Sequence, residues 1–599
     1  MKRHGRGTRV ALLLLLTMLV VGVAALLWWN RHRGSRSAVT ETTENDHPTK
    51  AGHLRLPELP KSSFLNTRAE ARYVGSEQCQ TCHEDAHDTY RETGMGRALD
   101  VLDPDNEPPD VVFDHPKSGR RYRVYRQDGQ MRHQESLLSN PDVVLADYAI
   151  RYVIGSGRHS RSYLLEIDGF MVESPVTWYT SSKAWGMSPG YDVPSHQGFS
   201  RAVDAGCLFC HSGNSRALGG SFHRMKIHET WIGCERCHGP GSLHLERRSS
   251  EADSSAAGDG ETDYTIVNPR HLDRKLSESI CSQCHLQATA AVMARGRSMT
   301  DFRPGLPLDF FRSDYRLDEE ASQMTVVGHV EQLRFSRCYQ QSELTCTTCH
   351  NPHGLPKKLE RVHYYRNKCL SCHSEEKCSV DPDVRMRKSS DNNCMTCHMP
   401  TSDTEIPHLA FTHHRIGIHS DQPKDEPTRR AGDLIFLSNL SAHSALDRQR
   451  MLGLAYMHAA EDEADANNAL EFETRAFEQL LEAWNGGLRD IDTAATLALL
   501  AGRGGQDVGE FVEYAMKQPD APGIVRVNAL LAATAWHAEQ GELAKALESA
   551  REVVQLRRAS GDWKLLSFLE AQSGNRVAAA AAFEKAAQID GLRPAQPQH

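Results

Sequence analysis

The chain has 599 residues, of which 39% are hydrophobic and 25% are charged, and its mean hydropathy is −0.53. This composition argues against a wholly disordered chain and against a protein with many membrane spans. Because 69 basic residues stand against 78 acidic ones, for a formal charge of −9, the chain lacks the basic excess typical of nucleic-acid binding, and we expect no nucleic-acid partner. The unusual counts are 16 Cys and 31 His.

The N-terminus carries an apolar segment. Residues 10–29 contain no charged side chain and are flanked on both sides by Lys or Arg, and twenty such residues can span a bilayer as one helix. Residues 1–36 are therefore predicted to be a single-pass anchor in the cell inner membrane, with the body in the periplasm or an equivalent extracytoplasmic space. The alternative is a cleaved signal peptide, with Val23 and Ala25 at its cleavage site, which also exports the body. Residues 37–70 are polar and contain proline, which predicts a flexible linker.

A Cys-x-x-Cys-His motif occurs seven times and uses fourteen of the sixteen cysteines. Two thiols three residues apart can form thioethers to neighbouring side groups of one haem, and the next His then binds the iron. A zinc site or a redox dithiol gives no reason for a His after every second Cys. We predict seven covalent haem c groups, attached through Cys79 and Cys82, Cys207 and Cys210, Cys234 and Cys237, Cys281 and Cys284, Cys346 and Cys349, Cys369 and Cys372, and Cys394 and Cys397, with iron bound by His83, His211, His238, His285, His350, His373 and His398.

The motif spacing bears on the fold. Successive motifs begin 128, 27, 47, 65, 23 and 25 residues apart, and the short intervals leave no room for one domain per haem. The haems must therefore pack against one another, and residues 71–420 are predicted to form one heptahaem domain of short helices and loops. Within it, residues 98–200 lack cysteine, and turn signals at 117–119 and 127–129 between alternating residues predict a β-hairpin, with further strands at 148–155 and 162–180. We expect a small β-containing insertion there in a mainly α chain.

The sixth iron ligands are not fixed by any motif. Sixteen histidines of residues 71–420 lie outside the motifs, so the count neither requires nor excludes an open iron. His87 and His353 lie too close in the chain to His83 and His350 to bind the same iron, but either could serve a neighbouring haem. Better candidates are His159, His244, His329, His408, His413 and His414. Met95 is a further candidate, because a thioether ligand raises the potential; the alternative is that Met95 packs against a haem edge.

Two cysteines lie outside the motifs, Cys338 and Cys378. In an oxidising compartment an even remainder predicts a disulfide between them. The alternative is two buried free thiols.

The composition changes after about residue 421 to Ala, Leu and Glu with helical periodicity and no cysteine. Residues 562–590 fit a helix-turn-helix repeat, and Gly541 and Gly574 lie 33 residues apart, which is one tetratricopeptide-repeat length. A more divergent copy begins near Leu452 and Gly453. Residues 421–599 are therefore predicted to be an all-α, tetratricopeptide-like domain that could bind a protein partner.

Several segments resemble a known family, namely residues 73–83, 93–98, 154–164, 234–241, 329–333, 397–400 and 411–416. They resemble a bacterial family of multihaem cytochromes c with a C-terminal tetratricopeptide-repeat region. The haem part is similar to the tetrahaem cytochromes of hydroxylamine oxidation and, more distantly, to multihaem nitrite reductases and hydroxylamine oxidoreductases. By position, this resemblance implies His244, His329, His408 and His414 as ligands. Met95 stands where the tetrahaem carriers usually have His, and the chain lacks the Cys-x-x-Cys-Lys motif of the nitrite reductases.

These observations predict a membrane-anchored cytochrome that passes electrons through seven haems to redox partner proteins. We predict no catalytic residue, and an electron-transfer role rather than an enzyme. The alternative is an oxidoreductase that acts on a small nitrogen or sulfur compound at one open haem. A third possibility is a scaffold in which the haems serve only as structural staples.

Overall fold

The computed structural model describes residues 56–250, 262–286, 288–317, 328–389, 391–401, 412–419, 432–521 and 523–592. The predicted membrane segment and His408 lie outside these residues. Within the described ranges, no helix has both the length and the apolar character needed to cross a bilayer. Short 3-10 helices connect the larger elements: η1 (Leu65–Thr67), η2 (Pro104–Asn106), η3 (Pro269–His271), η4 (Met299–Asp301), η5 (Leu308–Phe310) and η7 (Glu375–Lys377).

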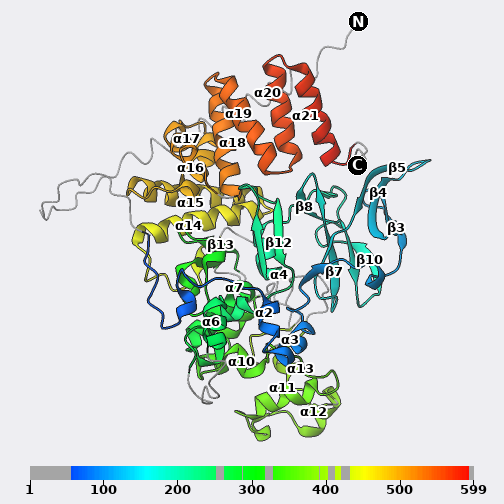
Figure 1. Ribbon diagram of the computed structural model, residues 1–599, viewed down its shortest axis with the longest axis vertical. Helices are drawn as coiled ribbons and strands as arrows, with labels where there is room; N and C mark the ends of the chain where they lie inside the picture. The colour runs from blue at the N-terminus through cyan, green and yellow to red at the C-terminus, as the bar shows by residue number, and fades with distance from the viewer. Residues whose placement is uncertain are drawn as a thin grey trace, which may run out of the picture. The chain divides into compact units, whose positions relative to one another are not determined.

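Two antiparallel sheets occupy most of the interval between the first two motifs (Figure 1). One has the order β1, β6, β7, β9, β10, with β8 also paired to β7, and the other is the meander β2 to β5. The strands are β1 (Leu99–Val101), β2 (Val111–His115), β3 (Arg120–Gln127), β4 (Gln130–Leu137), β5 (Val143–Ala149), β6 (Tyr152–Ile154), β7 (Ser160–Ile167), β8 (Phe170–Glu173), β9 (Val176–Tyr179) and β10 (Ala184–Met187). The predicted turn at 127–129 joins β3 to β4, where Asp128 and Gly129 both have positive φ, as a tight hairpin turn requires.

Strand β7 connects this β structure to the second motif. Neighbouring residues of a strand point to opposite faces, and here Leu165 packs with Tyr122 and Met131, whereas Leu164 packs with Leu208 of the second motif. Residues 148–155, predicted as one strand, instead contain the end of β5 and all of β6, which belong to different sheets. The β structure is therefore more than a small insertion.

Two further sheets lie outside that interval. They are the hairpin β11 (Asn214–Ala217) and β12 (Met225–Glu229), and the three-stranded sheet β13 (Ala290–Met293), β14 (Arg312–Leu317) and β15 (Leu434–Phe436). The prediction of a mainly α chain is therefore wrong, because the chain is mixed α and β. Strand β15 could not be found locally, since its three residues form a strand only by pairing with β14, more than a hundred residues earlier.

The motifs lie on short helices, as predicted. These helices and their neighbours are α2 (Ser76–Gln80), α3 (Glu84–Arg91), α4 (Ala205–His211), α5 (Glu235–His238), α6 (Ser242–Ser250), α7 (Arg274–His285), α8 (His329–Arg334), α9 (Arg337–Gln340), α10 (Cys346–Cys349), α11 (Arg361–Leu370), α12 (Pro382–Lys388) and α13 (Met395–His398). The end of the predicted flexible linker belongs to this fold: Phe64 and Asn66 are buried, and the Asn66 amide donates to the carbonyl oxygen of Pro304. The polar composition of this segment led to the wrong expectation for its last residues, because a polar side chain such as Asn66 can be buried when its amide is hydrogen-bonded.

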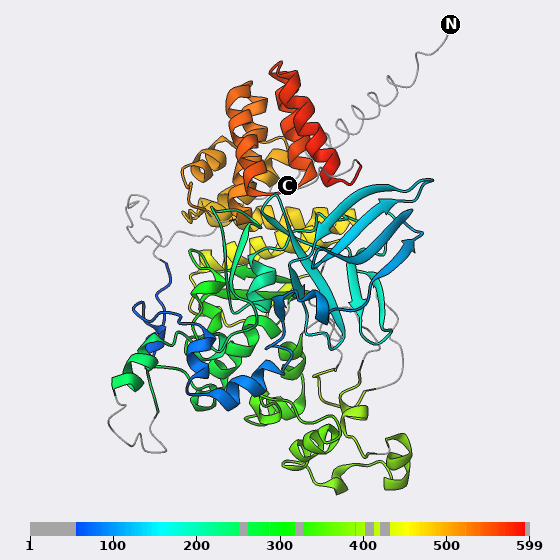
Figure 2. The same cartoon turned by 45° about the vertical axis from the view of Figure 1, so that its right-hand side comes forward.

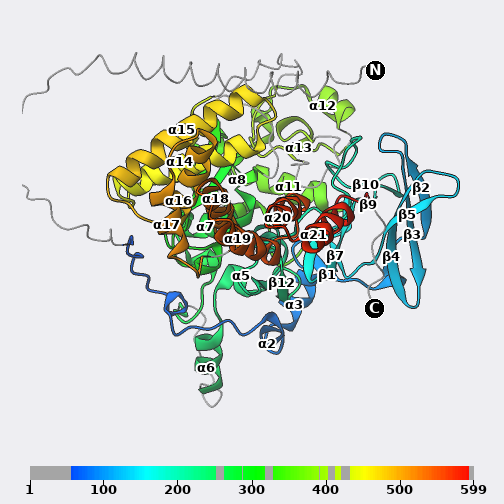
Figure 3. The ribbon, with the colours of Figure 1, turned by 90° about the horizontal axis from the view of Figure 1, so that it is seen from above.

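The C-terminal helices pack in consecutive pairs, which Figure 3 shows from above. They are α14 (Ala445–Asp462), α15 (Ala466–Asn485), α16 (Ile491–Arg503), α17 (Gly509–Met516), α18 (Gly523–Glu539), α19 (Leu543–Leu556), α20 (Ser560–Gln572) and α21 (Arg576–Ile589). Gly541 and Gly574 have positive φ in the turns between α18 and α19 and between α20 and α21. The small residue Gly453 lets α14 approach α15, because a Cβ there would lie 2.7 Å from Cγ of Leu480.

The last helices contact the β structure (Figure 2). The hydroxyl of Ser221, in the loop between β11 and β12, donates to the carbonyl of Leu556 in α19. Asp168, in the turn between β7 and β8, accepts from the ammonium of Lys585 at 2.7 Å. Arg558 is buried between them and donates to the carbonyl of Phe199.

Candidate haem-binding site

Each motif folds as one turn of helix. The backbone N–H of the motif His donates to the carbonyl of the first Cys, for example His83 to Cys79 at 3.0 Å and His350 to Cys346 at 3.0 Å, and the same bond occurs at His238, His373 and His398. Residues three and four apart lie on one face of a helical turn, so both thiols and the imidazole face the same side. This is the arrangement that two thioethers and an iron ligand on one haem require.

Four motif histidines face a second His ring from elsewhere in the chain. The ring centres of His83 and His244 are 6.5 Å apart with planes inclined by 20°, and those of His238 and His353 are 5.8 Å apart at 15°. His350 and His414 are 6.3 Å apart at 29°, and His285 and His329 are 5.5 Å apart at 78°.

These separations fit an iron between the rings. A bond of about 2 Å from metal to imidazole nitrogen on each side, plus the ring radii, places two such ring centres about 6 Å apart. Rings in direct contact through their faces would be closer. The separation within each pair is therefore close to the one that two imidazole ligands of a single iron would have. Two of the second rings, His329 and His414, also contact each other, with centres 4.5 Å apart.

The outer nitrogens of several of these rings are held by oxygen atoms. Nδ1 of His238 lies 2.7 Å from the carbonyl of Val267, and Nδ1 of His414 lies 2.9 Å from that of Thr412. Nδ1 of His398 lies 2.9 Å from the carbonyl of Gly417. A carbonyl only accepts, so each Nδ1 carries the proton and Nε2 keeps its lone pair for a metal.

Burial favours the neutral imidazole at three of the paired histidines, His238, His285 and His414. It lowers the pKa of His238, and it lowers the pKa of His285 to about 4 and that of His414 to about 3, with neighbouring histidines adding to the effect. A metal ligand must be deprotonated, so this environment suits iron binding.

His244 has a different outer partner. Its Nδ1 lies 2.9 Å from Oδ2 of Asp263, a carboxylate that also accepts from the backbone N–H of Thr265 at 2.9 Å. Burial alone raises the pKa of Asp263, but the hydrogen bonds from Thr265 and His244 outweigh it and lower the pKa to about 2. Nothing in the local sequence around residue 263 indicated this contact.

Buried hydrogen bonds bring the first and third motifs together. The carboxylate of Glu235 accepts the backbone N–H groups of Val74, Gly75 and Gly241 at 2.8 to 3.1 Å. Burial raises the pKa of Glu235 even though these bonds oppose the shift. The hydroxyl of Ser76 accepts the N–H of Cys234 at 2.8 Å.

Thiols of different motifs touch one another. The side chain of Cys79 is in hydrogen-bonding contact with that of Cys234, and Cys210 with Cys284. Cys281 contacts Cys346 in the same way, and Cys369 contacts Cys394. Sequence spacing could not indicate which motifs are neighbours.

The remaining predicted ligands have other surroundings. His159 is exposed, and its carbonyl accepts the N–H of Thr180. Nδ1 of His413 accepts the N–H of Arg415 at 3.2 Å, and its ring packs on His419. Met95 is half-buried, and its carbonyl accepts the N–H of Ile232, just before the third motif. The structure thus pairs His244, His329 and His414 with motif histidines, together with His353, which the sequence left as one of two histidines for a neighbouring haem.

The predicted disulfide is wrong. Cys338 and Cys378 are both free thiols. The sulfur of Cys338 points to the hydroxyl of Ser336 at 3.6 Å, whereas the thiol of Cys378 faces Arg385 and the backbone of Val380, whose hydrogen bonds lower its pKa. The prediction rested on an even number of cysteines outside the motifs, and that number gives no information on the distance between them.

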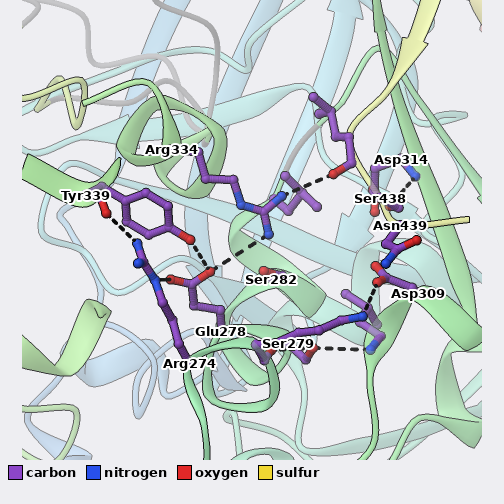
Figure 4. A pocket seen from close by; sticks show the side chains of 14 residues that line it. Arg274, Glu278, Ser279, Ser282, Asp309, Asp314, Arg334, Tyr339, Ser438 and Asn439 are labelled. Atoms are coloured by element: carbon purple, nitrogen blue, oxygen red, sulfur yellow. Dashed lines mark hydrogen bonds and ion pairs between the residues drawn. The ribbon is translucent and has the colours of Figure 1, made fainter. Parts of the chain in front are cut away.

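A cavity of about 380 Å³ lies along α7, and the side chains that line it include Arg274, Glu278 and Ser282 of this helix (Figure 4). Its charged groups pair across the walls: Glu278 accepts from the hydroxyl of Tyr339 at 2.7 Å and from Arg274, and Lys275 lies 3.0 Å from Asp309. These charged groups of the cavity wall are therefore already paired with one another.

One family of known proteins matches part of the chain. Residues 184–239 match the family model described as "Cytochrome c554 and c-prime", and this segment includes the motifs at Cys207 and Cys234. That domain implies covalently bound haem c, and the protein is a multihaem c-type cytochrome.

Solved structures give weaker likenesses. The structure "Crystal Structure of Outer Cell Wall Cytochrome OcwA" is 15% identical over 86% of this chain and 99% of that chain, with a TM-score of 0.29. The structure "MamA MSR-1 C2" is 17% identical over 25% of this chain and 80% of that chain, with a TM-score of 0.20. No curated protein matches the sequence.

Proposed function

We propose that the protein carries seven haem c groups and conducts electrons through them. The observation that carries this proposal is the set of four His pairs, His83 with His244, His238 with His353, His285 with His329 and His350 with His414. Haem c, when bound, supplies an iron that alternates between the ferrous and ferric states. Two protein ligands on an iron leave no position for a substrate, which favours electron transfer over catalysis.

The contacts between motifs support a continuous path. Thiol contacts join the first motif to the third, the second to the fourth, the fourth to the fifth, and the sixth to the seventh. His353 follows the fifth motif and pairs with the His of the third, which joins these two. The hydroxyl of Tyr365, in the helix that carries Cys369, lies 3.3 Å from Nδ1 of His350, which joins the fifth to the sixth.

The chain holds these positions with buried groups. Glu235 fixes the segment before the first motif against the third, and Leu208 ties the second motif to the β structure. Rigid positions matter because electron transfer between cofactors depends on their separation, while no ligand needs to bind or leave.

A count of cofactors tests the proposal. Protein matured with haem is expected to contain seven irons and seven haem c groups per chain, measured by iron analysis, by the pyridine haemochrome spectrum and by intact mass. Markedly fewer than seven would contradict it. In the oxidised protein we expect low-spin ferric signals from the four His pairs; a high-spin signal that moves on adding nitrite or cyanide would favour the enzymatic alternative.

We further propose that residues 10–29 anchor the protein in the inner membrane and that helices α14–α21 form tetratricopeptide-like repeats that bind a redox partner. The apolar run supports the first part, and the paired helices support the second. Fractionation of cells tests the anchor: the haem protein is expected in the membrane fraction and is expected to be released by proteolysis in the linker.

Cross-linking to a redox partner tests the role of the repeats. Val577 and Phe583 are both exposed on α21, and the double variant Val577→Glu with Phe583→Glu is expected to abolish the cross-link. A partner that is retained would contradict the docking role.

A further inference from the structure

We propose that Asp263 is a positioning residue that lowers the reduction potential of the iron held between His83 and His244, so that electrons pass from this iron to the one held by His238. This inference rests on the proposed function, because it takes His244 as an axial ligand. It starts from one contact, Nδ1 of His244 at 2.9 Å from Oδ2 of Asp263. Both side chains are mostly buried, with 20% and 14% exposed.

Asp263 is held firmly in this orientation. Its Oδ1 accepts the backbone N–H and the hydroxyl of Thr265, and lies 3.3 Å from Nη1 of Arg247. Its Oδ2, which faces His244, lies 3.1 Å from Nη2 of Arg248. Both guanidinium groups contact the carboxylate directly and offset part of its charge, but only the carboxylate lies within hydrogen-bond distance of Nδ1 of His244. The hydrogen bond from His244 to a carboxylate is therefore what distinguishes this site.

The neighbouring iron site has a neutral partner instead. Nδ1 of His238 donates to the carbonyl of Val267 at 2.7 Å. A carboxylate is a stronger hydrogen-bond acceptor than an amide carbonyl, so it draws the Nδ1 proton more and makes the imidazole a stronger donor to iron. A stronger donor stabilises ferric iron over ferrous iron and lowers the reduction potential.

The two sites are adjacent, because the thiols of Cys79 and Cys234 touch. With haem bound at both sites, one electron would pass from ferrous iron at the first site to ferric iron at the second, so that the first is oxidised and the second reduced by one electron, with no proton moved and no bond broken. The hydrogen bond between His244 and Asp263 would favour this direction.

The test is a spectroelectrochemical titration of the full-length, haem-loaded protein with Asp263→Asn. Asparagine keeps the size of the side chain and can still accept from His244, but it has no charge. At a fixed applied potential we expect the ratio of ferric to ferrous iron at this one site to fall about tenfold, which corresponds to about 59 mV. The low-spin ferric resonance of the same haem is expected to shift, since it reports imidazole donor strength. His244→Ala identifies that component, because the loss of a ligand turns its signal high-spin.

Glu246→Gln is the matched control. Glu246 lies on the same helix, α6, and is exposed beside Arg72 at 3.5 Å, so this variant removes one negative charge while the hydrogen bond to His244 stays. An equal shift in the control, or no shift with Asp263→Asn, overturns the inference. If His244→Ala changes no haem signal, the proposed ligand pairing itself fails, which is a separate result.

If the Asp263→Asn protein does not incorporate haem, Arg248→Gln is the variant to titrate instead. It frees the carboxylate for His244 and is expected to lower the potential of the same component; an unchanged or raised potential contradicts the inference.

Discussion

The rings of His238 and His353 lie 5.8 Å apart with their planes inclined by only 15°, although 115 residues separate them in the chain. His238 belongs to the third motif, and His353 follows the fifth by three residues. One side chain therefore brings the third and fifth motifs together, and the proposed ligand His353 can be tested by its effect on the third motif.

Replacing His353 with Ala is expected to leave the iron of the third motif with one protein ligand. Its ferric signal changes from low-spin to high-spin, while the other irons keep their spectra, because their own rings remain in place. Electron paramagnetic resonance of the oxidised protein measures this change. His363→Ala is the matched control, since His363 lies in α11 nearby and its ring is hydrogen-bonded to Asn367. High-spin iron in the control, or none with His353→Ala, would show that the pairing is wrong.

Much of the haem site could be predicted from sequence, because its chemistry is local. Five residues contain both thiols and the iron ligand, and one helical turn aligns them. The partners of these motifs could not be predicted in the same way. His353 meets His238, and Asp263 meets His244, only through the packing of distant segments, so neither contact leaves a local pattern.

The errors in the predicted fold have the same cause, namely contacts between residues that are far apart in the sequence. The hairpin of β3 and β4 has its turn residues and alternation in one stretch, and it was found. Strand β15 and the burial of Asn66 depend on partners far away in the chain, and both were missed. The disulfide between Cys338 and Cys378 was inferred from a count alone, without any distance.

We expect acid to destabilise the β structure through His133. This side chain is fully buried, with Nδ1 at 2.7 Å from the hydroxyl of Ser174, and burial lowers its pKa to about 3. Above about pH 6.5 the imidazole of His133 is unprotonated in both the folded and the unfolded protein. Between about pH 6.5 and 3 it is protonated only in the unfolded protein. The free energy of unfolding therefore falls by up to about 1.4 kcal/mol per pH unit as the pH decreases. Hydrogen exchange of residues 120–149 measures this loss. In His133→Gln the slope is expected to be smaller, and an equal slope would exclude His133 as its source.

The contact between the last helices and the β structure is expected to weaken in Asp168→Asn. Asp168 pairs with Lys585 at 2.7 Å and lies 3.6 Å from Nε of the buried Arg558. Asn tolerates the positive φ of residue 168, so only the charge is lost. The partly exposed pair with Lys585 contributes about 0.5 kcal/mol, and the buried Arg558 left with less compensation adds to the cost. Faster hydrogen exchange at residues 556–558 would show the weakening. Asp128→Asn, at an exposed hairpin turn with the same backbone conformation, is the control and is expected to leave this exchange unchanged.

Close packing of the first helical pair is tested by Gly453→Ala. A Cβ at residue 453 would lie 2.7 Å from Cγ and 2.9 Å from Cδ2 of Leu480, so α14 and α15 must move apart, at a cost of about 1–3 kcal/mol. Gly502→Ala is the matched control in α16, where the nearest atom would be 3.9 Å away; there the better helix propensity of Ala is expected to leave stability unchanged or raised by up to about 1 kcal/mol. Hydrogen exchange of α14 compares the two variants with the unaltered protein. Equal protection in both would mean that the glycine is not needed for the approach of the helices. Faster exchange in Gly453→Ala alone is the result that steric contact with Leu480 requires.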